Sequence, residues 1–450
     1  MELYKGNTKM KLLMVFMPVF IGNLINIIYY LADTIWIGNM VGKDAIATTT
    51  IVYPIVILFS SIAAGIGNAI TIHVSNAYGK NDKDYLYQFI KVSIIFSLLV
   101  GIVLVVLLEG FSNQMLILLK TPEEIFVDTK EYLQITLLSF FFVNLYYCIS
   151  GILRGMGNTT LTMVLLMVSM VLNIVLDPIM INGYLFIPQL RVNGAAMATL
   201  ISQGLVTIIL ILILLTNKKV YVMFRYIAPL NLFCKLGIKS ILSIGQQIIP
   251  AVSLLFITTL ISACGVSSVA AFGIIGKLDS IILLAAGSMN ITLTTAFGQC
   301  YGAKEEKIAF LYLRNGVIVS LIITILSQVG IFAIMGSIGG IFGVGSEVVD
   351  LISDYFVYLI LGYIFSDIAC CIVGAINGMG NVAKATSIMA VGFLAIRVPL
   401  GYIMFHYFSL NGIWLSITIS YFVMFLNSII LNYKTSNVIQ EKQKTSVVGD

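Results

Sequence analysis

The chain has 450 residues, of which 59% are hydrophobic and only 10% are charged. Soluble globular domains carry roughly 25% charged residues, so a soluble protein of this composition would expose large apolar patches and aggregate. The net charge of +5 comes from basic segments between apolar runs and does not indicate a nucleic-acid partner. The composition therefore indicates a protein embedded in a lipid bilayer, where the outer surface is apolar as well.

Twelve apolar runs, each long enough to cross a bilayer, follow one another along the chain. They begin near residues 12, 46, 88, 126, 159 and 193 in the first half, and near residues 240, 267, 308, 350, 382 and 411 in the second half. The first run follows three lysines and has no small-residue cleavage motif, so it is predicted to be a membrane helix rather than a signal peptide. The sequence therefore predicts an all-α integral membrane protein of about twelve transmembrane helices.

The basic residues are distributed unevenly between the two sides that this order of spans defines. With the N-terminus placed inside, 19 of the 25 lysines and arginines, Arg154 among them, lie in inner connections or termini, and 4 lie outside. Cytoplasmic loops of membrane proteins carry such an excess of lysine and arginine. We therefore expect a multi-pass protein of the plasma membrane with both termini in the cytoplasm.

Three glycine-centred motifs of the first half recur in the second half at a single offset of 223 residues. The pairs are Gly42 and Gly265, Gly79 and Gly302, and Gly155 and Gly378. Around the last pair, the segments GILRGMGN and GAINGMGN agree at five of eight positions. Each half holds six spans, an even number, so both halves are expected to enter the membrane from the same side, as parallel repeats do.

The polar stretch 217–239 is the natural linker between the two repeats. It separates a six-helix bundle of residues 1–216 from a second bundle of residues 240–434, and residues 435–450 are expected to form a cytoplasmic tail. Substrate sites in such repeats lie near the middle of the membrane, between the halves. No HExxH, DDxxD or SxxK pattern indicates an enzyme, and no Cys/His pattern indicates a metal site. The sequence therefore predicts a transporter.

Several motifs in a fixed order carry a family resemblance. They are Pro18 with Asp33 in the first span, GNMVGKDAIA, AYGKND, ILRGMGNTT, NIVLDPIMI and VNGAAMAT in the first half, and GQCYGAKEEK and GAINGMGN in the second half. Together they resemble the bacterial multidrug and toxic compound extrusion (MATE) transporters over nearly the whole chain. The loop AYGKNDKDY lacks the arginine of the signature found in major facilitator transporters, which also have six plus six spans.

The resemblance implies two bundles that form a V around a central cavity, and export by alternating access. The implied cargo is a small amphipathic compound, often cationic, which is exchanged for Na⁺ or H⁺. No cofactor is implied beyond this coupling ion, and the chain is expected to act as a monomer. The alternative function is a lipid or lipid-linked precursor flippase of the same superfamily, although flippases of peptidoglycan precursors usually have fourteen spans and a cationic cavity.

Polar residues at one depth of the first half form a candidate cation site. Asp33 and Asp177 each lie about five residues before the outer end of a span, and Thr199 lies about six residues after the sixth span re-enters, which puts all three at a similar level at about 1.5 Å per residue. Asn173 shares the face of Asp177 one turn away. The family's first-half cation site matches these four residues. A structural polar cluster that joins three helices is the alternative interpretation.

The second half contains a weaker set of candidates for substrate or cation binding. Asp367 matches a family carboxylate, and Asn144 holds the equivalent place in the first half, since each lies seven residues before a glycine. Asp367 is expected either to pair with Lys277 or to meet substrate, while Lys277 and Asp279 are two residues apart and do not face each other on a helix. The acid that some relatives carry on the seventh span is absent, because that span reads SIGQQIIPAVSLLF.

Two further residues of the first span are candidates. Tyr30 belongs to a set of aromatic residues that could line a cavity for flat cations. Pro18, fifteen residues before Asp33, is expected to kink the first span or to act as its hinge.

Overall fold

The computed structural model describes the backbone of residues 1–184, 188–216, 226 and 228–447. Within these ranges the side chains of residues 30–35, 38, 39, 43, 44, 46 and 434–447 are not described. All regular secondary structure in the described part is helical, as the composition predicts.

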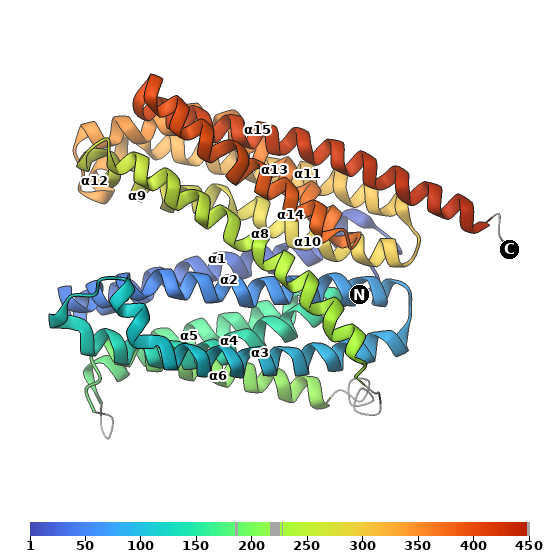
Figure 1. Cartoon of the computed structure of the whole chain (residues 1–450), viewed down its shortest axis with the longest axis horizontal. Helices are drawn as coiled ribbons and strands as arrows, with labels where there is room; N and C mark the ends of the chain where they lie inside the picture. The colour runs from blue at the N-terminus through green and yellow to red at the C-terminus, as the bar shows by residue number, and fades with distance from the viewer. Residues whose placement is uncertain (185–187, 217–225, 227, 448–450) are drawn as a thin grey trace. The chain divides into compact units, whose positions relative to one another are not determined.

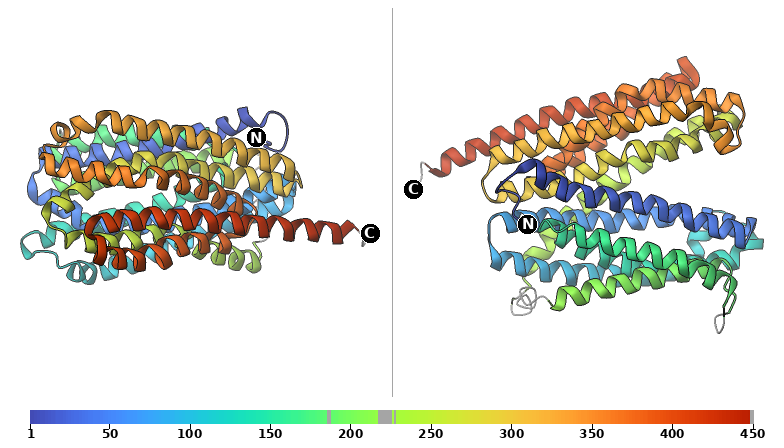
Figure 2. Two further views of the ribbon diagram at one scale, coloured as in Figure 1. Left: turned by 90° about the horizontal axis from the view of Figure 1, so that it is seen from above. Right: turned by 180° about the vertical axis from the view of Figure 1, so that it is seen from behind.

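Six long helices make up the first half of the chain (Figure 1). They are α1 (Thr8–Met40), α2 (Lys43–Gly79), α3 (Lys83–Leu118), α4 (Phe126–Gly155), α5 (Thr160–Asn182) and α6 (Val192–Thr216). The right view of Figure 2 shows these helices next to one another along their lengths. Their starts agree with the predicted spans because each begins where an apolar run follows a glycine or a polar turn.

The second half contains long helices, some of which are divided into shorter segments. They are α8 (Leu230–Ser262), α9 (Val266–Ile282), α10 (Leu284–Gly302), α11 (Glu306–Ile334), α12 (Ile338–Phe342), α13 (Ser346–Gly378), α14 (Val382–Ala390), a π-helix (Val391–Ile396) and α15 (Arg397–Val447). The helix α8 begins inside the stretch predicted to be a linker, since Leu232 and Leu236, four residues apart, are buried and hold its first turns in place.

Eleven described helical stretches are long and apolar enough to cross a membrane, one fewer than the predicted twelve. The last of them, Val382–Tyr433, supplies two spans because the chain turns back at Ser409, whose backbone is not helical (φ 51°, ψ −133°). Arg397 Nε donates to Ser420 Oγ over 3.0 Å, although 23 residues of straight helix would separate them by roughly 35 Å. The described residues therefore contain twelve helical stretches of a length that can cross a membrane.

The repeat is visible in the contacts of the two halves. Thr71 Oγ1 on α2 donates to the carbonyl of Gly151 on α4 over 3.1 Å, and Thr294 Oγ1 on α10 donates to the carbonyl of Gly374 on α13 over 3.2 Å. Both residues of the second contact follow those of the first by 223 positions. Gly42 and Gly265, at the starts of α2 and α9, likewise share positive φ angles of 106° and 100°, which only glycine adopts without strain.

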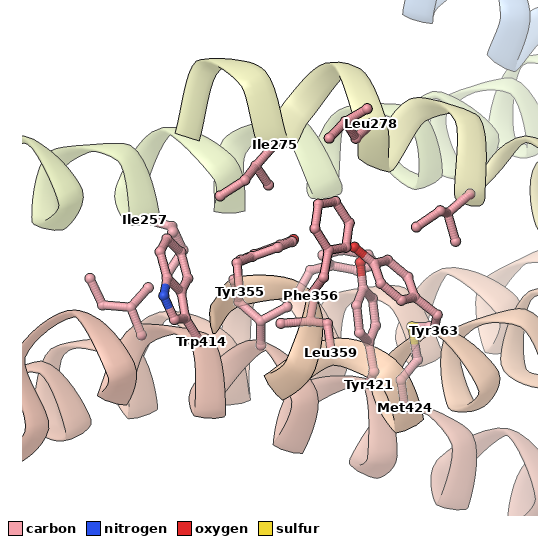
Figure 3. Packing of buried hydrophobic residues seen from close by; sticks show 14 of the residues in the cluster. Ile257, Ile275, Leu278, Tyr355, Phe356, Leu359, Tyr363, Trp414, Tyr421 and Met424 are labelled. Carbon is pink, nitrogen blue, oxygen red and sulfur yellow. The ribbon is translucent and has the colours of Figure 1, made fainter. Parts of the chain in front are cut away.

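The chain forms two compact units. The first contains Met1 and residues 17–244, and the second contains residues 2–16 and 245–450. The helices α1 and α8 therefore each contribute to both units. Figure 3 shows the interior of the second unit, where Tyr355 and Tyr363 of α13 and Trp414 and Tyr421 of α15 pack among aliphatic side chains.

Candidate functional site

A polar cluster joins three helices of the first unit. On α5, Asn173 Nδ2 donates to Asp177 Oδ1 over 3.3 Å, as expected for side chains one helical turn apart. The same amide donates to Thr199 Oγ1 on α6 over 3.3 Å. The Thr199 hydroxyl also shares a 2.9 Å hydrogen bond with the hydroxyl of Tyr29 on α1. The structure therefore brings Asn173, Asp177 and Thr199 together and adds Tyr29 to them.

The chemistry of this cluster suits a monovalent cation or a proton. The side chains of Asn173 and Asp177 are fully buried, and Asn173 Oδ1 has no hydrogen-bond donor among the described residues. Pro178 lies inside α5 and has no N–H, so it leaves a carbonyl of the preceding turn without its usual helical donor. Carboxylate, amide and hydroxyl oxygens are hard ligands for a metal cation, and a carboxylate inside a membrane can instead carry a proton.

Two predicted residues of α1 lie outside the part of the chain whose side chains are described. They are Asp33, the second carboxylate of the predicted cation site, and Tyr30, a predicted cavity residue. Both positions are helical, because α1 continues to Met40.

A cavity lies within the first unit, beside the polar cluster. It encloses about 1350 Å³ of space free of protein atoms, including its open mouth. Tyr29 and Thr199 line it, so the polar cluster borders this space directly. The aromatic part of the lining comes from Phe59, Tyr132, Phe140, Tyr146 and Tyr147, and the polar part includes Asn23, Asn26, Ser60, Thr136, Ser139, Ser150, Thr162 and Gln203.

One face of α4 lines the cavity along most of the helix. The lining residues from Tyr132 to Arg154 recur every three or four positions, which is the spacing of a single helical face. At about 1.5 Å per residue this face is roughly 33 Å long. Arg154, predicted to lie in an inner connection, lies in the last turn of α4 and lines the cavity.

Pro18 also lines the cavity, from inside α1. The helix continues through it, and the division between the two compact units falls immediately before it, between Phe16 and Met17. This position is compatible with the predicted kink or hinge.

Asp367 and Asn144 occupy equivalent places in the two units. Ser320 Oγ on α11 donates to Asp367 Oδ1 over 2.5 Å, and Asn144 Nδ2 donates to the carbonyl of Ser97 on α3 over 2.8 Å. Ser320 follows Ser97 by 223 positions, so each polar residue pairs with the same neighbouring helix. The predicted pairing of Asp367 with Lys277 is wrong, because the Lys277 ammonium lies on the surface, 5.8 Å from the ring centre of Phe342.

Asp279 accepts hydrogen bonds from the hydroxyls of Tyr355, over 2.6 Å, and Tyr363. Nearby, the Arg397 guanidinium lies beside the perpendicular rings of Phe393 and Tyr421, at 4.3 and 4.6 Å from their centres. Both oxygens of Asp279 therefore have donors inside the second unit, which gives Asp279 an identified structural role. Arg397 is held by these ring contacts and by the bond from its Nε to Ser420, while its Nη2 has no acceptor in the described part of the chain.

Comparison with known proteins identifies the family. The MatE family model matches residues 18–179 and again residues 243–403, once in each repeat. The probable multidrug resistance protein YoeA of Bacillus subtilis is 25% identical over 438 residues, covering 95% of this chain and 93% of the relative. The multidrug export protein MepA of Staphylococcus aureus is 24% identical over 426 residues, covering 93% and 92%.

Solved structures show the same fold. A MATE transporter of Vibrio cholerae, VcmN, superimposes with a TM-score of 0.89 at 23% identity, covering 96% of this chain and 97% of that chain. A transporter of the MOP superfamily from Pyrococcus furiosus, described as having a binding pocket of reverse polarity, gives a TM-score of 0.90 at 21% identity and 98% coverage of both chains. Because the family model covers well over half of the sequence, the chain belongs to the MATE family and is a multi-pass membrane transporter rather than an enzyme.

Proposed function

We propose that this transporter exports small amphipathic compounds, often cationic ones, in exchange for Na⁺ or H⁺ by alternating access. The observation that carries the proposal is the contact between the polar cluster, which includes the buried Asp177, and the cavity. Thr199 bonds to Asn173 on its buried side and to Tyr29 on its other side, and both Thr199 and Tyr29 line the cavity. Asn173 alone connects Asp177 to Thr199 in the cavity wall. Binding of a cation or proton at Asp177 can therefore affect the cavity wall through this one side chain.

The coupling follows from the cost of a buried charge. A carboxylate within a membrane helix is costly unless a cation or proton compensates it. When Na⁺ or H⁺ binds Asp177, this carboxylate becomes a weaker acceptor for the amide of Asn173, and the hydrogen bonds of Asn173 and Thr199 change. Thr199 bonds directly to Tyr29 of α1, the helix that contains Pro18. A ligand shifts a conformational equilibrium by its difference in affinity for the two states. We propose that Asp33 of α1 completes this site.

The cavity lining supports the proposed substrates. The rings of Phe59 and Phe140 pack at a tilt of 57° with their centres 5.3 Å apart, and Tyr146 and Tyr147 continue the aromatic surface along α4. Flat aromatic compounds pack well against such surfaces. The relatives named above are multidrug resistance and export proteins, which does not favour the flippase alternative. The excess of inner lysines and arginines supports a cytoplasmic location of both termini, and we propose a monomer.

Transport by purified protein in proteoliposomes tests the proposal. Export of a fluorescent aromatic cation such as ethidium is measured with a Na⁺ gradient alone and with a pH gradient alone. One of the two gradients should drive export, and Asp177→Asn and Asp33→Asn should each abolish it. Asp367→Asn, on the far repeat, should have a milder effect that depends on the substrate.

Glu109→Gln is the matched control, because Glu109 is an intramembrane carboxylate of the first unit that pairs with Gln134 and does not line the cavity. It should keep normal rates. The proposed site is wrong if Asp367→Asn stops transport while both first-half variants keep near-normal rates.

A further inference from the structure

Arg154 carries the only formal charge among the described residues that line the cavity. Its guanidinium forms no ion pair, since the single ion pair among the described residues joins Lys5 and Glu2 at the surface. Its Nε is buried without a hydrogen-bond acceptor in the described part of the chain. A guanidinium has five N–H donors in a rigid planar fork, so Arg154 has donor capacity that the described protein groups leave unused.

The helix α2 makes room for this side chain. A Cβ at Gly67 would lie 3.3 Å from a terminal nitrogen of Arg154 and 2.7 Å from the carbonyl oxygen of Tyr147. Glycine at this position therefore lets α2 and α4 approach closely while the guanidinium occupies the space beside them. The Tyr146 hydroxyl donates to the carbonyl of Thr162 over 3.0 Å.

The polar cluster that contains Asp177 is too distant to neutralise Arg154. The helices α4 and α6 run parallel, because Asn193 Nδ2 donates to Glu131 Oε2 over 2.7 Å and Thr207 Oγ1 donates to the carbonyl of Phe142 over 3.2 Å. Thr199 lies between Asn193 and Thr207 on α6, so along the bundle axis it lies beside the part of α4 between Glu131 and Phe142. Arg154 is at least twelve residues farther along, which is at least about 18 Å. The cavity thus borders the polar cluster toward one end and has a guanidinium toward the other.

The repeat shows that the fold does not need a cation at this place. Position 377 follows position 154 by 223 residues, and Asn377 is fully buried there. Its amide exchanges two hydrogen bonds with the side chain of Gln246, of 3.0 and 3.2 Å. The second unit therefore fills the equivalent position with a neutral, fully satisfied amide, whereas the first unit has an arginine that faces a cavity.

From this arrangement we propose that Arg154 is an anion-binding subsite of the cavity, and that it binds the carboxylate or a similar acidic group of an amphipathic aromatic substrate. A guanidinium binds a carboxylate through two parallel hydrogen bonds, and such charge-assisted bonds are strong where little water is present. The aromatic surface of Phe140, Tyr146 and Tyr147 lies along the same face of α4, where it would hold the rest of the molecule. This inference rests on the proposed function for the direction of transport, but the binding step is independent of it.

The test compares a rhodamine dye that has a free carboxylate with the methyl ester of the same dye. Binding to the full chain in lipid nanodiscs is followed by fluorescence anisotropy. The wild type should bind the acid more tightly than the ester. Arg154→Asn, which installs the residue of the second repeat, should weaken binding of the acid about tenfold or more and leave the ester nearly unchanged. Arg154→Lys should keep part of the preference, because it keeps the charge but not the fork.

Lys80→Asn is the control for charge alone. Lys80 is exposed at the end of α2, and it lies near the same end of the bundle as Arg154, since Gly155 of α4 packs against Val74 and Ser75 of α2. It does not line the cavity and should leave both affinities unchanged. If Arg154→Asn weakens the acid and the ester equally, or weakens neither, the anion subsite is refuted. If acid binding depends on Arg154 but no dye is exported under any cation gradient, the subsite stands and the proposed function fails.

Discussion

The contact between Gly151 and Gly67 makes the packing of α4 on α2 sensitive to a single methyl group. A Cβ at position 151 would overlap the carbonyl oxygen of Gly67 and lie 3.2 Å from its Cα. Gly151→Ala therefore requires the two helices to separate by about 1 Å, since neither backbone can rotate away as a side chain could. The same movement stretches the 3.1 Å hydrogen bond from Thr71 to Gly151 beyond hydrogen-bonding distance.

The expected loss of stability combines two terms. Overpacking of this kind costs about 1–3 kcal/mol, and a lost interhelical hydrogen bond in a membrane protein costs about 1 kcal/mol. Gly151→Ala should therefore lower the free energy of unfolding by about 2–4 kcal/mol, as measured by thermal unfolding of detergent-purified protein. Gly374→Ala should cost a similar amount, because its Cβ would meet Asn290 in the same way, 2.9 Å from the Cα. Gly110→Ala is the control, since no atom lies within 4 Å of a Cβ there. A Gly151→Ala protein as stable as the Gly110→Ala protein would refute the close packing of α2 and α4.

Other substitutions test separate contacts by the same unfolding measurement. Ser409→Gly should stabilise the protein by about 1 kcal/mol, because glycine adopts the φ of 51° and ψ of −133° of Ser409 without strain. Ser409→Val should destabilise it. Equal stabilities of the two variants would show that the turn is not strained. Asp279→Ala should cost about 2–4 kcal/mol, because it leaves two buried tyrosine hydroxyls without an acceptor, and Tyr363→Phe should cost less. Arg397→Lys should cost about 1–2 kcal/mol, because lysine keeps the charge but loses the guanidinium's contacts with Phe393 and Tyr421 and its Nε bond to Ser420. An unchanged midpoint of unfolding would contradict the importance of these contacts.

Features that repeat along the sequence could be predicted from it. The 223-residue offset of three glycines predicted two related halves, and the structure adds pairs that no motif indicated, such as Ser97 with Asn144 and Ser320 with Asp367. Hydropathy predicted the twelve spans, but not the form of the last connection. The segment around Ser409 is short, and its turn combines the strained backbone of Ser409 with the close packing of Gly412, where a Cβ would overlap the carbonyl oxygen of Met404.

The limits of the sequence appear most clearly at the site. Depth and helical spacing predicted that Asn173, Asp177 and Thr199 lie together, because both quantities depend only on position within a span. The partner of Asp367 could not be predicted in this way, since Ser320 comes from another helix and its distance depends on packing. Arg154 was assigned to a loop because a charge near the end of an apolar run usually faces water. Only the structure shows that the last turn of α4 lines a cavity.

The central claim is that the cluster around Asp177 couples cation movement to substrate movement. The most direct measurement reverses the proposed reaction in proteoliposomes, where a substrate gradient is imposed without any initial cation gradient. Counterflow of Na⁺, followed with a sodium-sensitive dye, or of H⁺, followed with a pH-sensitive dye, is recorded inside the vesicles. Wild-type protein should move one of the two cations against the substrate flow, and Asp177→Asn should not. Substrate movement without counterflow of either cation, or full counterflow in Asp177→Asn, would contradict the account.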